Sequence, residues 1–244
     1  MKEKVVKNKK DDFGLNIEEM FSAGLHFGHY LSNIHPKMMP YLKGVKNNIR
    51  IINLDITKQK FAEALKFIED LISQGKTLLF VGTKIQTKKL IEETAKECNL
   101  PFVSYRWLGG TFTNFPVIKK RIDYYKDLEK KKESGELEKY TKKEKAKINK
   151  ELERLMKKFD GIKDLQKLPE AVFITDLKKD YLAAKEARKM KIKIIAITDS
   201  NVDPTLADYP IPANDDAISS VNYILGKVKE VILKAKSEKK EETK

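Results

Sequence analysis

The sequence has very little cysteine and no long apolar run. Its 244 residues include one cysteine, Cys98, so no internal disulfide can form, a usage typical of proteins from a reducing compartment. No apolar stretch approaches the roughly 20 residues that a membrane-spanning helix needs. The basic first ten residues are not followed by an apolar segment, which argues against a secretory signal, and have too few serines and arginines for a typical transit peptide. We therefore expect a cytoplasmic protein.

Enzyme signatures are missing as well. Val81-Gly82-Thr83-Lys84 follows a predicted strand, where backbone amides could hold a phosphate. It lacks the remaining glycines of a dinucleotide-binding fingerprint and is not a Walker A loop. Gly109-Gly110 is equally isolated, and no pairing of nucleophile and base stands out. The sequence thus predicts no catalytic residue, no cofactor and no enzymatic activity.

What the sequence does contain is an excess of positive charge. Lys and Arg total 50 against 36 for Asp and Glu, which gives a formal net charge of +14. Such an excess draws a protein toward polyanions, either nucleic acid or an acidic membrane surface, and does not choose between them. The length suits one large domain, or a domain with a sizeable appendage.

Histidines and aspartates form two patterns that resemble metal sites. His26-Phe27-Gly28-His29 has suitable spacing and His35 lies nearby, but zinc needs three or four converging ligands. Asp199-Ser200-Asn201-Val202-Asp203 begins like a calcium loop, yet Pro204 and Pro210 replace its turn glycine and terminal glutamate. We predict no metal: the histidines are structural or face RNA, and the aspartates cap a loop.

Short β-branched runs alternate with amphipathic stretches in two blocks. The expected strands are 49–54, 77–81, 102–104, 171–174 and 192–197, and the expected helices are 57–73, one through 90–95, 178–190 and one from 214–216 toward 236. This alternation predicts an α/β fold with a mainly parallel sheet covered on both faces, a Rossmann-like or flavodoxin-like sandwich. The body covers residues 14–115 and 161–236, with a flexible basic tail at 1–13 and a charged tail at 237–244.

The segment 116–160 between the two blocks differs from them in charge and in the spacing of its apolar residues. It contains 16 Lys and Arg and 10 Asp and Glu, an excess of six positive charges. Apolar residues recur every three or four positions at Ile118, Ile122 and Tyr125 and again at Ile148, Leu152, Leu155 and Phe159. Ser134-Gly135 offers a turn, and Thr141 with Glu144 matches a capping box. We predict an inserted antiparallel coiled-coil hairpin that either contacts RNA or is merely a solvated charged hairpin.

Two glycine-containing loop regions mix basic, polar and aromatic residues, at 29–50 and 105–114. Lys and Arg neutralise phosphates, Asn and Thr donate to phosphate or ribose, and aromatic faces stack on unpaired bases. We favour phosphate contacts for Lys37, Lys46, Arg50 and Arg106. For Trp107 a role in covering the sheet edge is an equal alternative.

At these residues the sequence closely resembles the bacterial-type ribosomal protein S-two family, the second-numbered protein of the small subunit. The motifs run colinearly over about residues 16–235. They are Ala23–His29, Pro36–Met38, Ile51–Leu54, Phe80–Lys84, Arg106–Asn114, Gly161–Asp164, Leu168–Ala171, Thr198–Pro204 and Ile211–Ile218.

The resemblance implies a Rossmann-like body with a protruding coiled-coil hairpin and a structural role in the small subunit, in contact with its rRNA. The implied partners are small-subunit rRNA and other small-subunit proteins, among them in bacteria the large mRNA-binding protein numbered one. Three positions depart from the family pattern. Residues 32–35 lack its usual basic pair and tryptophan, Asn48 stands where glycine is common, and Ala213 precedes Asn214, so a different turn is expected there.

Together these features predict a scaffold that binds RNA through its basic loops and hairpin. The predicted RNA-binding residues are Lys37, Lys46, Asn47, Arg50, Lys84, Arg106, Trp107, Thr113, Asn114, Lys119 and Lys120. Two other classes of function stay open at this point. One is a nucleotide-binding enzyme on the same sheet, and the other is a coiled-coil adaptor whose hairpin binds a protein.

Overall fold

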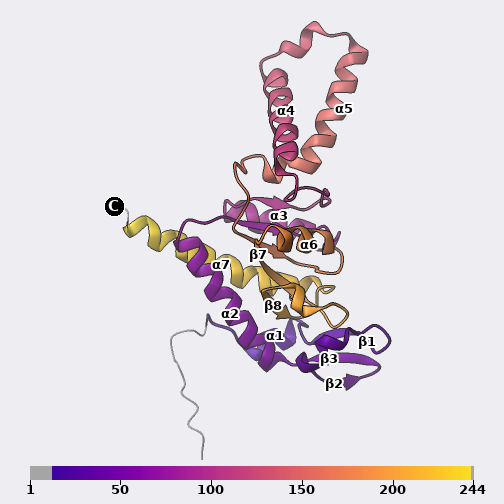
Figure 1. Cartoon of the computed structure of the whole chain (residues 1–244), viewed down its shortest axis with the longest axis vertical. Coiled ribbons are helices and arrows are strands. Elements are labelled where there is room, and N and C mark those ends of the chain that lie inside the picture. The colour runs from indigo at the N-terminus through magenta and orange to yellow at the C-terminus, as the bar shows by residue number, and fades with distance from the viewer. Residues whose placement is uncertain (1–12, 243–244) are drawn as a thin grey trace, which may run out of the picture. The chain divides into compact units, whose positions relative to one another are not determined.

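The computed structural model describes residues 13–242 (Figure 1). The chain consists of two compact units. Unit 1 consists of residues up to 75, residues 197–205 and residues from 209 onward, and unit 2 of residues 76–196 and 206–208. The tail predicted at 1–13 lies outside the described residues except for Phe13. Among the helices described, none combines the length and apolar character needed to cross a bilayer.

Unit 1 contains a small antiparallel sheet with the strand order β1-β3-β2. Its helices and strands are α1 (Ile17–Ser22), β1 (Phe27–Tyr30), η1 (Pro36–Tyr41), β2 (Leu42–Lys46), β3 (Ile49–Ile52), α2 (Leu54–Ser73), β8 (Tyr209–Pro212) and α7 (Ile218–Glu242). Of the three strands in this sheet the sequence predicted only β3. The other two contain glycine, lysine or histidine, and only one of their residues, Val45, is β-branched, so their sequences lack the composition that would mark a strand.

Helix α2 confirms the predicted helix over 57–73 but begins earlier, at Leu54. The Asn53 side chain accepts a hydrogen bond from the Asp55 N–H, an N-cap that also ends β3 at Ile52. One face of α2 buries Phe61, Leu65 and other apolar residues, and the helix packs against α7 and β8. Burying each such side chain contributes roughly 1.5–3 kcal/mol, so this face holds unit 1 together.

The two strands β2 and β3 are joined by Asn47 and Asn48. Both residues have positive φ, 50° and 62°, as a two-residue hairpin turn with the right twist requires. Asparagine tolerates this left-handed backbone better than most residues, which explains how Asn48 can stand where glycine is common in the family pattern. Ala213, by contrast, is not among the residues with positive φ.

Unit 2 is built on parallel strands. Its helices and strands are β4 (Leu78–Val81), α3 (Lys88–Glu97), β5 (Phe102–Val103), α4 (Phe115–Glu133), η2 (Glu136–Lys139), α5 (Lys142–Phe159), η3 (Asp160–Ile162), β6 (Ala171–Ile174), α6 (Tyr181–Lys189) and most of β7 (Lys193–Thr198). β4 pairs in parallel with β5 and β6, and β6 with β7. β8 follows β7, whose last two residues belong to the same unit as β8.

The sheet order β5-β4-β6-β7-β8 becomes 2-1-3-4-5 when these strands are numbered along the chain, the order of flavodoxin-like folds. Every residue of β4 and β6 is buried, as expected for strands with helices on both faces. The α/β class predicted from the sequence is therefore confirmed.

Helices α4 and α5, drawn in magenta and pink in Figure 1, occupy most of the segment 116–160. The two helices contact each other. The spaced apolar residues Ile118, Ile122, Leu152 and Leu155 are all buried. The predicted capping box is confirmed: the Thr141 side chain accepts from the Glu144 N–H, and the Glu144 carboxylate accepts from the Thr141 N–H at 3.0 Å. Local chemistry thus fixes where α5 begins.

Candidate nucleic-acid interface

The β2–β3 hairpin of unit 1 presents part of the predicted RNA-binding set to solvent. Lys46 and Asn47 are exposed at its tip. Arg50 is half-buried on β3, and its Nε is buried with no partner among the described residues. Because this Nε has almost no exposed surface, a phosphate could reach Arg50 only through the terminal guanidinium nitrogens.

Lys37 lies on η1 and already has a partner within the protein. Its Nζ is 2.7 Å from Asp203 Oδ2 and 3.1 Å from Thr205 Oγ1. Burial works to raise the pKa of Asp203, but the hydrogen bonds from Lys37 and Thr205 outweigh it and hold the pKa at about 2. The pair is exposed enough at Lys37 to let the ammonium turn toward a phosphate, at the cost of this contact.

The loop between β5 and α4 is organised by one buried carboxylate, Glu186 of α6. Glu186 accepts hydrogen bonds from the backbone N–H groups of Gly110, Phe112 and Thr113 at 2.8, 3.0 and 3.2 Å. It also accepts from Trp107 Nε1 at 3.3 Å. Burial acts to raise the pKa of Glu186, yet these donors outweigh it and the pKa lies below its usual value.

The fold separates the buried aromatic residues of this loop from its exposed polar residues. Trp107 is 6% exposed and packs edge-on against Phe112, with ring centres 4.8 Å apart. This geometry matches the alternative in which Trp107 covers the sheet. Arg106, Thr113 and Asn114 are exposed, and of these Thr113 donates its hydroxyl to Glu186 at 3.2 Å. Arg106 and Asn114 keep exposed side chains outside this network.

Lys84 follows β4 and is half-buried. Its Nζ lies 3.2 Å from Asp176 Oδ2. The neighbouring Thr83 donates its N–H and its hydroxyl to Asp180 at 3.1 and 2.9 Å. These contacts join the loop after β4 to the loop after β6, and Lys84 takes part in them through its ion pair with Asp176.

Lys119 and Lys120 stand on the first turns of α4. Lys120 is exposed, while Lys119 Nζ donates to the Gln166 carbonyl at 3.5 Å, a long and weak contact. Both ammonium groups are available to a polyanion at the base of α4.

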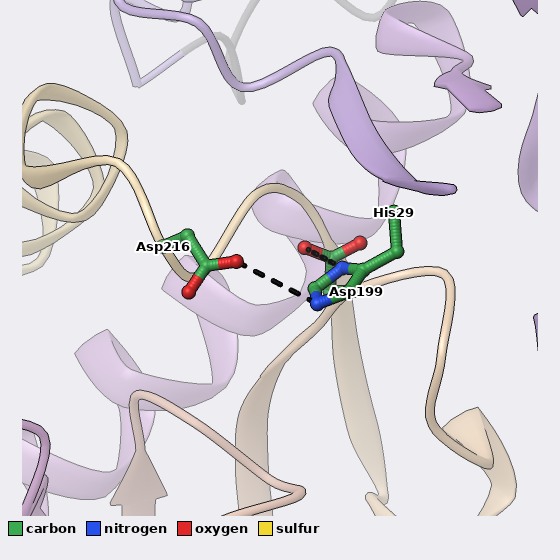
Figure 2. Close-up of side chains that lie close together, drawn as sticks. All are labelled: His29, Asp199 and Asp216. Atoms are coloured by element: carbon green, nitrogen blue, oxygen red, sulfur yellow. Dashed lines mark ion pairs between the residues drawn. The ribbon is translucent and has the colours of Figure 1, made fainter. Parts of the chain in front are cut away.

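A separate cluster in unit 1 joins three residues that are far apart in sequence (Figure 2). His29 Nδ1 lies 3.1 Å from Asp199 Oδ2, and its Nε2 lies 3.6 Å from Asp216 Oδ2. The interaction with Asp199 is the largest cause that raises the pKa of His29, and it outweighs burial. One ligand atom from each residue falls within 4.8 Å of the others, so an imidazole and two carboxylates could together hold a divalent cation.

The members of this cluster belong to separate sequence motifs. His29 shares its motif with His26, but His26 is buried and stacks on Phe21 with ring centres 4.1 Å apart, which is a structural role. Asp199 was expected to cap a loop, and Asp216 lies where the last helix was expected to begin. Each lies in a motif that the sequence makes visible, but the convergence of both carboxylates on His29 left no signal in the sequence.

Comparison with known proteins gives a consistent result. The profile of the family described as Ribosomal protein S2 matches residues 20–235. A small ribosomal subunit protein uS2 from Dictyoglomus thermophilum is 46% identical over 93% of this chain and 92% of its own length. The uS2c protein of Rhodomonas salina is 45% identical over 89% and 90%, and the uS2 protein of Sorangium cellulosum 42% over 94% and 83%. The chain belongs to the ribosomal protein S2 family.

Proposed function

We infer that this protein is a structural component of the small ribosomal subunit, where it associates with rRNA and neighbouring proteins and catalyses no reaction. The observation that carries this conclusion is the family match over residues 20–235 together with relatives named as small-subunit proteins. The net charge of +14 supports contact with a polyanion.

We propose that five of the seven exposed members of the predicted set make the first contacts with RNA, because the other two, Lys37 and Thr113, already bind a carboxylate within the protein. The five are Lys46, Asn47, Arg106, Asn114 and Lys120. Arg50 and Lys119 contribute from half-buried positions. Lys37 and Lys84 must exchange an aspartate for a phosphate, so each gives a smaller net gain. Trp107 and Thr113 act by shaping the loop around Glu186.

We also propose that α4 and α5 form an antiparallel coiled-coil hairpin over 116–160, inserted between the body segments 14–115 and 161–236. Its spaced buried residues and its excess of six positive charges support this assignment. The hairpin would reach a second rRNA or protein surface. The large mRNA-binding protein numbered one is a candidate neighbour of the chain.

The test is sedimentation of a lysate on a sucrose gradient, with and without substitutions. We expect the chain to sediment with the small subunit and to remain bound to it after a moderate salt wash. The variant Lys46→Gln/Arg106→Gln/Lys120→Gln should lower subunit occupancy with its melting curve unchanged. The matched control Lys89→Gln/Lys185→Gln/Lys189→Gln alters exposed lysines outside the set. A chain that stays at the top of the gradient contradicts the function, whereas equal occupancy of both variants contradicts only the residue assignment.

A further inference from the structure

Unit 2 contains a pocket of about 610 Å³ at the carboxyl ends of its parallel strands. Its walls come from the loops after β4, β5 and β6 and from α5. β4 lies between β5 and β6, so the chain leaves β4 in one direction and later returns on its other side. Open parallel sheets bind ligands at such a reversal of strand order, and the volume suits a small molecule or one nucleotide.

The charged side chains that line this pocket are all cations. They are Arg106, Arg154, Lys158 and Lys179. Within residues 13–242, Arg106 and Lys158 form no ion pair. Arg154 is 3.7 Å from Glu151 in an exposed pair, which holds the guanidinium only weakly. Four cations without a lining carboxylate favour an anionic ligand, and guanidinium groups favour phosphate.

Backbone amides do not serve this pocket in the way that they serve a phosphate-binding loop. The Thr83 N–H and hydroxyl are already bound to the Asp180 carboxylate. Gly82 has no free space around it, because a Cβ there would clash with the side chains of Ile91 and Thr175. Recognition of a phosphate therefore falls to the side chains at the rim, which fits binding rather than phosphoryl transfer.

An aromatic ring stands beside these cations. Tyr105 is 48% exposed, lines the pocket, and has Lys88 Nζ 5.2 Å from its ring centre. Ile85, also at the rim, is 86% exposed. A flat ring next to basic residues is the arrangement on which proteins stack an unpaired base while they neutralise its phosphate.

We propose that this pocket binds a single nucleotide unit, its phosphate held by Arg106, Arg154 and Lys158 and its base lying against Tyr105. The same chemistry is offered by an unpaired nucleotide of an RNA strand and by a free mononucleotide. The choice of an RNA strand as the source of the nucleotide rests on the proposed function. The assignment of the pocket as a nucleotide-binding site does not. No bond is made or broken.

The experiment measures the fluorescence anisotropy of a labelled single-stranded hexaribonucleotide titrated with the purified full chain. Arg106→Gln/Arg154→Gln should weaken binding about ten-fold and lower the slope of log K against log salt by roughly 0.7 for each phosphate that the variant no longer neutralises. Tyr105→Ala should weaken binding by about ten-fold as well, and Tyr105→Phe should keep most of the affinity, because stacking survives. The control Lys185→Gln/Arg188→Gln removes two exposed cations of α6 outside the pocket.

Competition identifies the source of the nucleotide. Displacement of the probe by unlabelled hexaribonucleotide but not by AMP or ATP supports an RNA strand. Displacement by AMP at similar concentrations supports a free nucleotide. Equal weakening in the pocket and control variants, or no binding of either ligand by the wild-type chain, overturns the proposal. Sedimentation of the same variants with the small subunit separates this failure from a failure of the proposed function. Thermal melts by circular dichroism identify any variant that is unfolded. If the arginine variant is unfolded, Arg106→Lys replaces it.

Discussion

The β2–β3 hairpin and the 105–114 loop both contain basic and amide-bearing residues, but different interactions hold them in shape. Only the loop adds aromatic residues, Tyr105, Trp107 and Phe112. In the hairpin, backbone pairing such as Val45 with Arg50 and Lys46 with Ile49 sets the shape, and the polar side chains are left outside. In the loop, three backbone amides and an indole N–H converge on Glu186, and the polar groups are used internally.

Because of this difference, substitutions in the hairpin should mainly affect binding, and substitutions in the loop should mainly affect stability. A ladder of backbone hydrogen bonds tolerates changes in exposed side chains, so charge in the hairpin can be altered at little cost in stability. A loop organised by one buried carboxylate depends on that carboxylate, because its donors have no other partner when it is removed. Substitutions in the two regions should therefore change different measurable quantities.

The largest effect is expected for Glu186→Ala. Five donors around this buried carboxylate lose their acceptor, namely three backbone N–H groups, the Trp107 indole and the Thr113 hydroxyl, so the free energy of unfolding should fall by at least about 3 kcal/mol. Urea denaturation followed by circular dichroism measures this decrease, and Trp107 fluorescence reports the loop directly. The exposed neighbour Lys185→Ala is the control and should change the free energy by less than about 0.5 kcal/mol. A decrease as small as that of the control would show that the loop is held by other interactions.

The second effect is a pH dependence that Glu186→Gln should remove. The pKa of Glu186 is lower in the folded protein than in the unfolded chain, so its ionised form stabilises the fold above the unfolded pKa of about 4.3. That stabilisation is lost as the pH falls through the lower, folded pKa. The difference in unfolding free energy between wild type and Glu186→Gln should be constant from about pH 6 to 7 and shrink below about pH 4. A difference that persists unchanged into acid would argue against ionised Glu186 as the cause.

A smaller effect is expected in the hairpin turn. Asn48→Ala places an alanine at φ 62°, which should lower the unfolding free energy by about 1–2 kcal/mol. Asn48→Gly is the matched variant, because glycine adopts this conformation without strain and should leave stability near the wild-type value. Chemical denaturation of both variants makes the comparison. Equal stability of the two would mean that the turn changes its conformation to relieve the alanine.

The smallest effect on stability is expected for Lys46→Gln at the tip of the hairpin. The side chain is exposed, so the unfolding free energy should change by less than about 0.5 kcal/mol. RNA affinity should nevertheless fall, and the slope of log K against log salt should decrease by roughly 0.7–0.9 if one phosphate is no longer neutralised. Filter binding at several salt concentrations measures both quantities. An unaltered slope would remove Lys46 from the interface.

Much of the fold followed from local patterns. The run at 171–174 became β6 with the same bounds, and the Thr141–Glu144 capping box marked the start of α5. The helix expected to approach Lys236 continues to Glu242, because lysine and glutamate at its end favour helix without an apolar stripe to mark it. Strands β1 and β2 were missed, since a short strand with mixed side chains becomes a strand only through its partner β3.

The candidate interface, like the fold, could be predicted from the sequence only in part. Residue type and position identified basic residues that are indeed exposed, such as Lys46, Arg106 and Lys120. The sequence could not indicate that Lys37 and Lys84 have aspartate partners, or that Trp107 faces inward. Each of these outcomes depends on an interaction with a distant part of the chain.

The sequence by itself determined the charge, the alternation of strands and helices, the helix caps and the family, because each is written in neighbouring residues or in colinear motifs. Only the tertiary structure decided that Trp107 donates to Glu186, 79 residues away, and that His29 meets Asp199 and Asp216. It likewise placed Arg106, Arg154 and Tyr105 around one pocket. The physical reason is that burial and pairing of polar groups depend on which segments the folded sheet brings together, and sequence periodicity carries no record of such long-range partners.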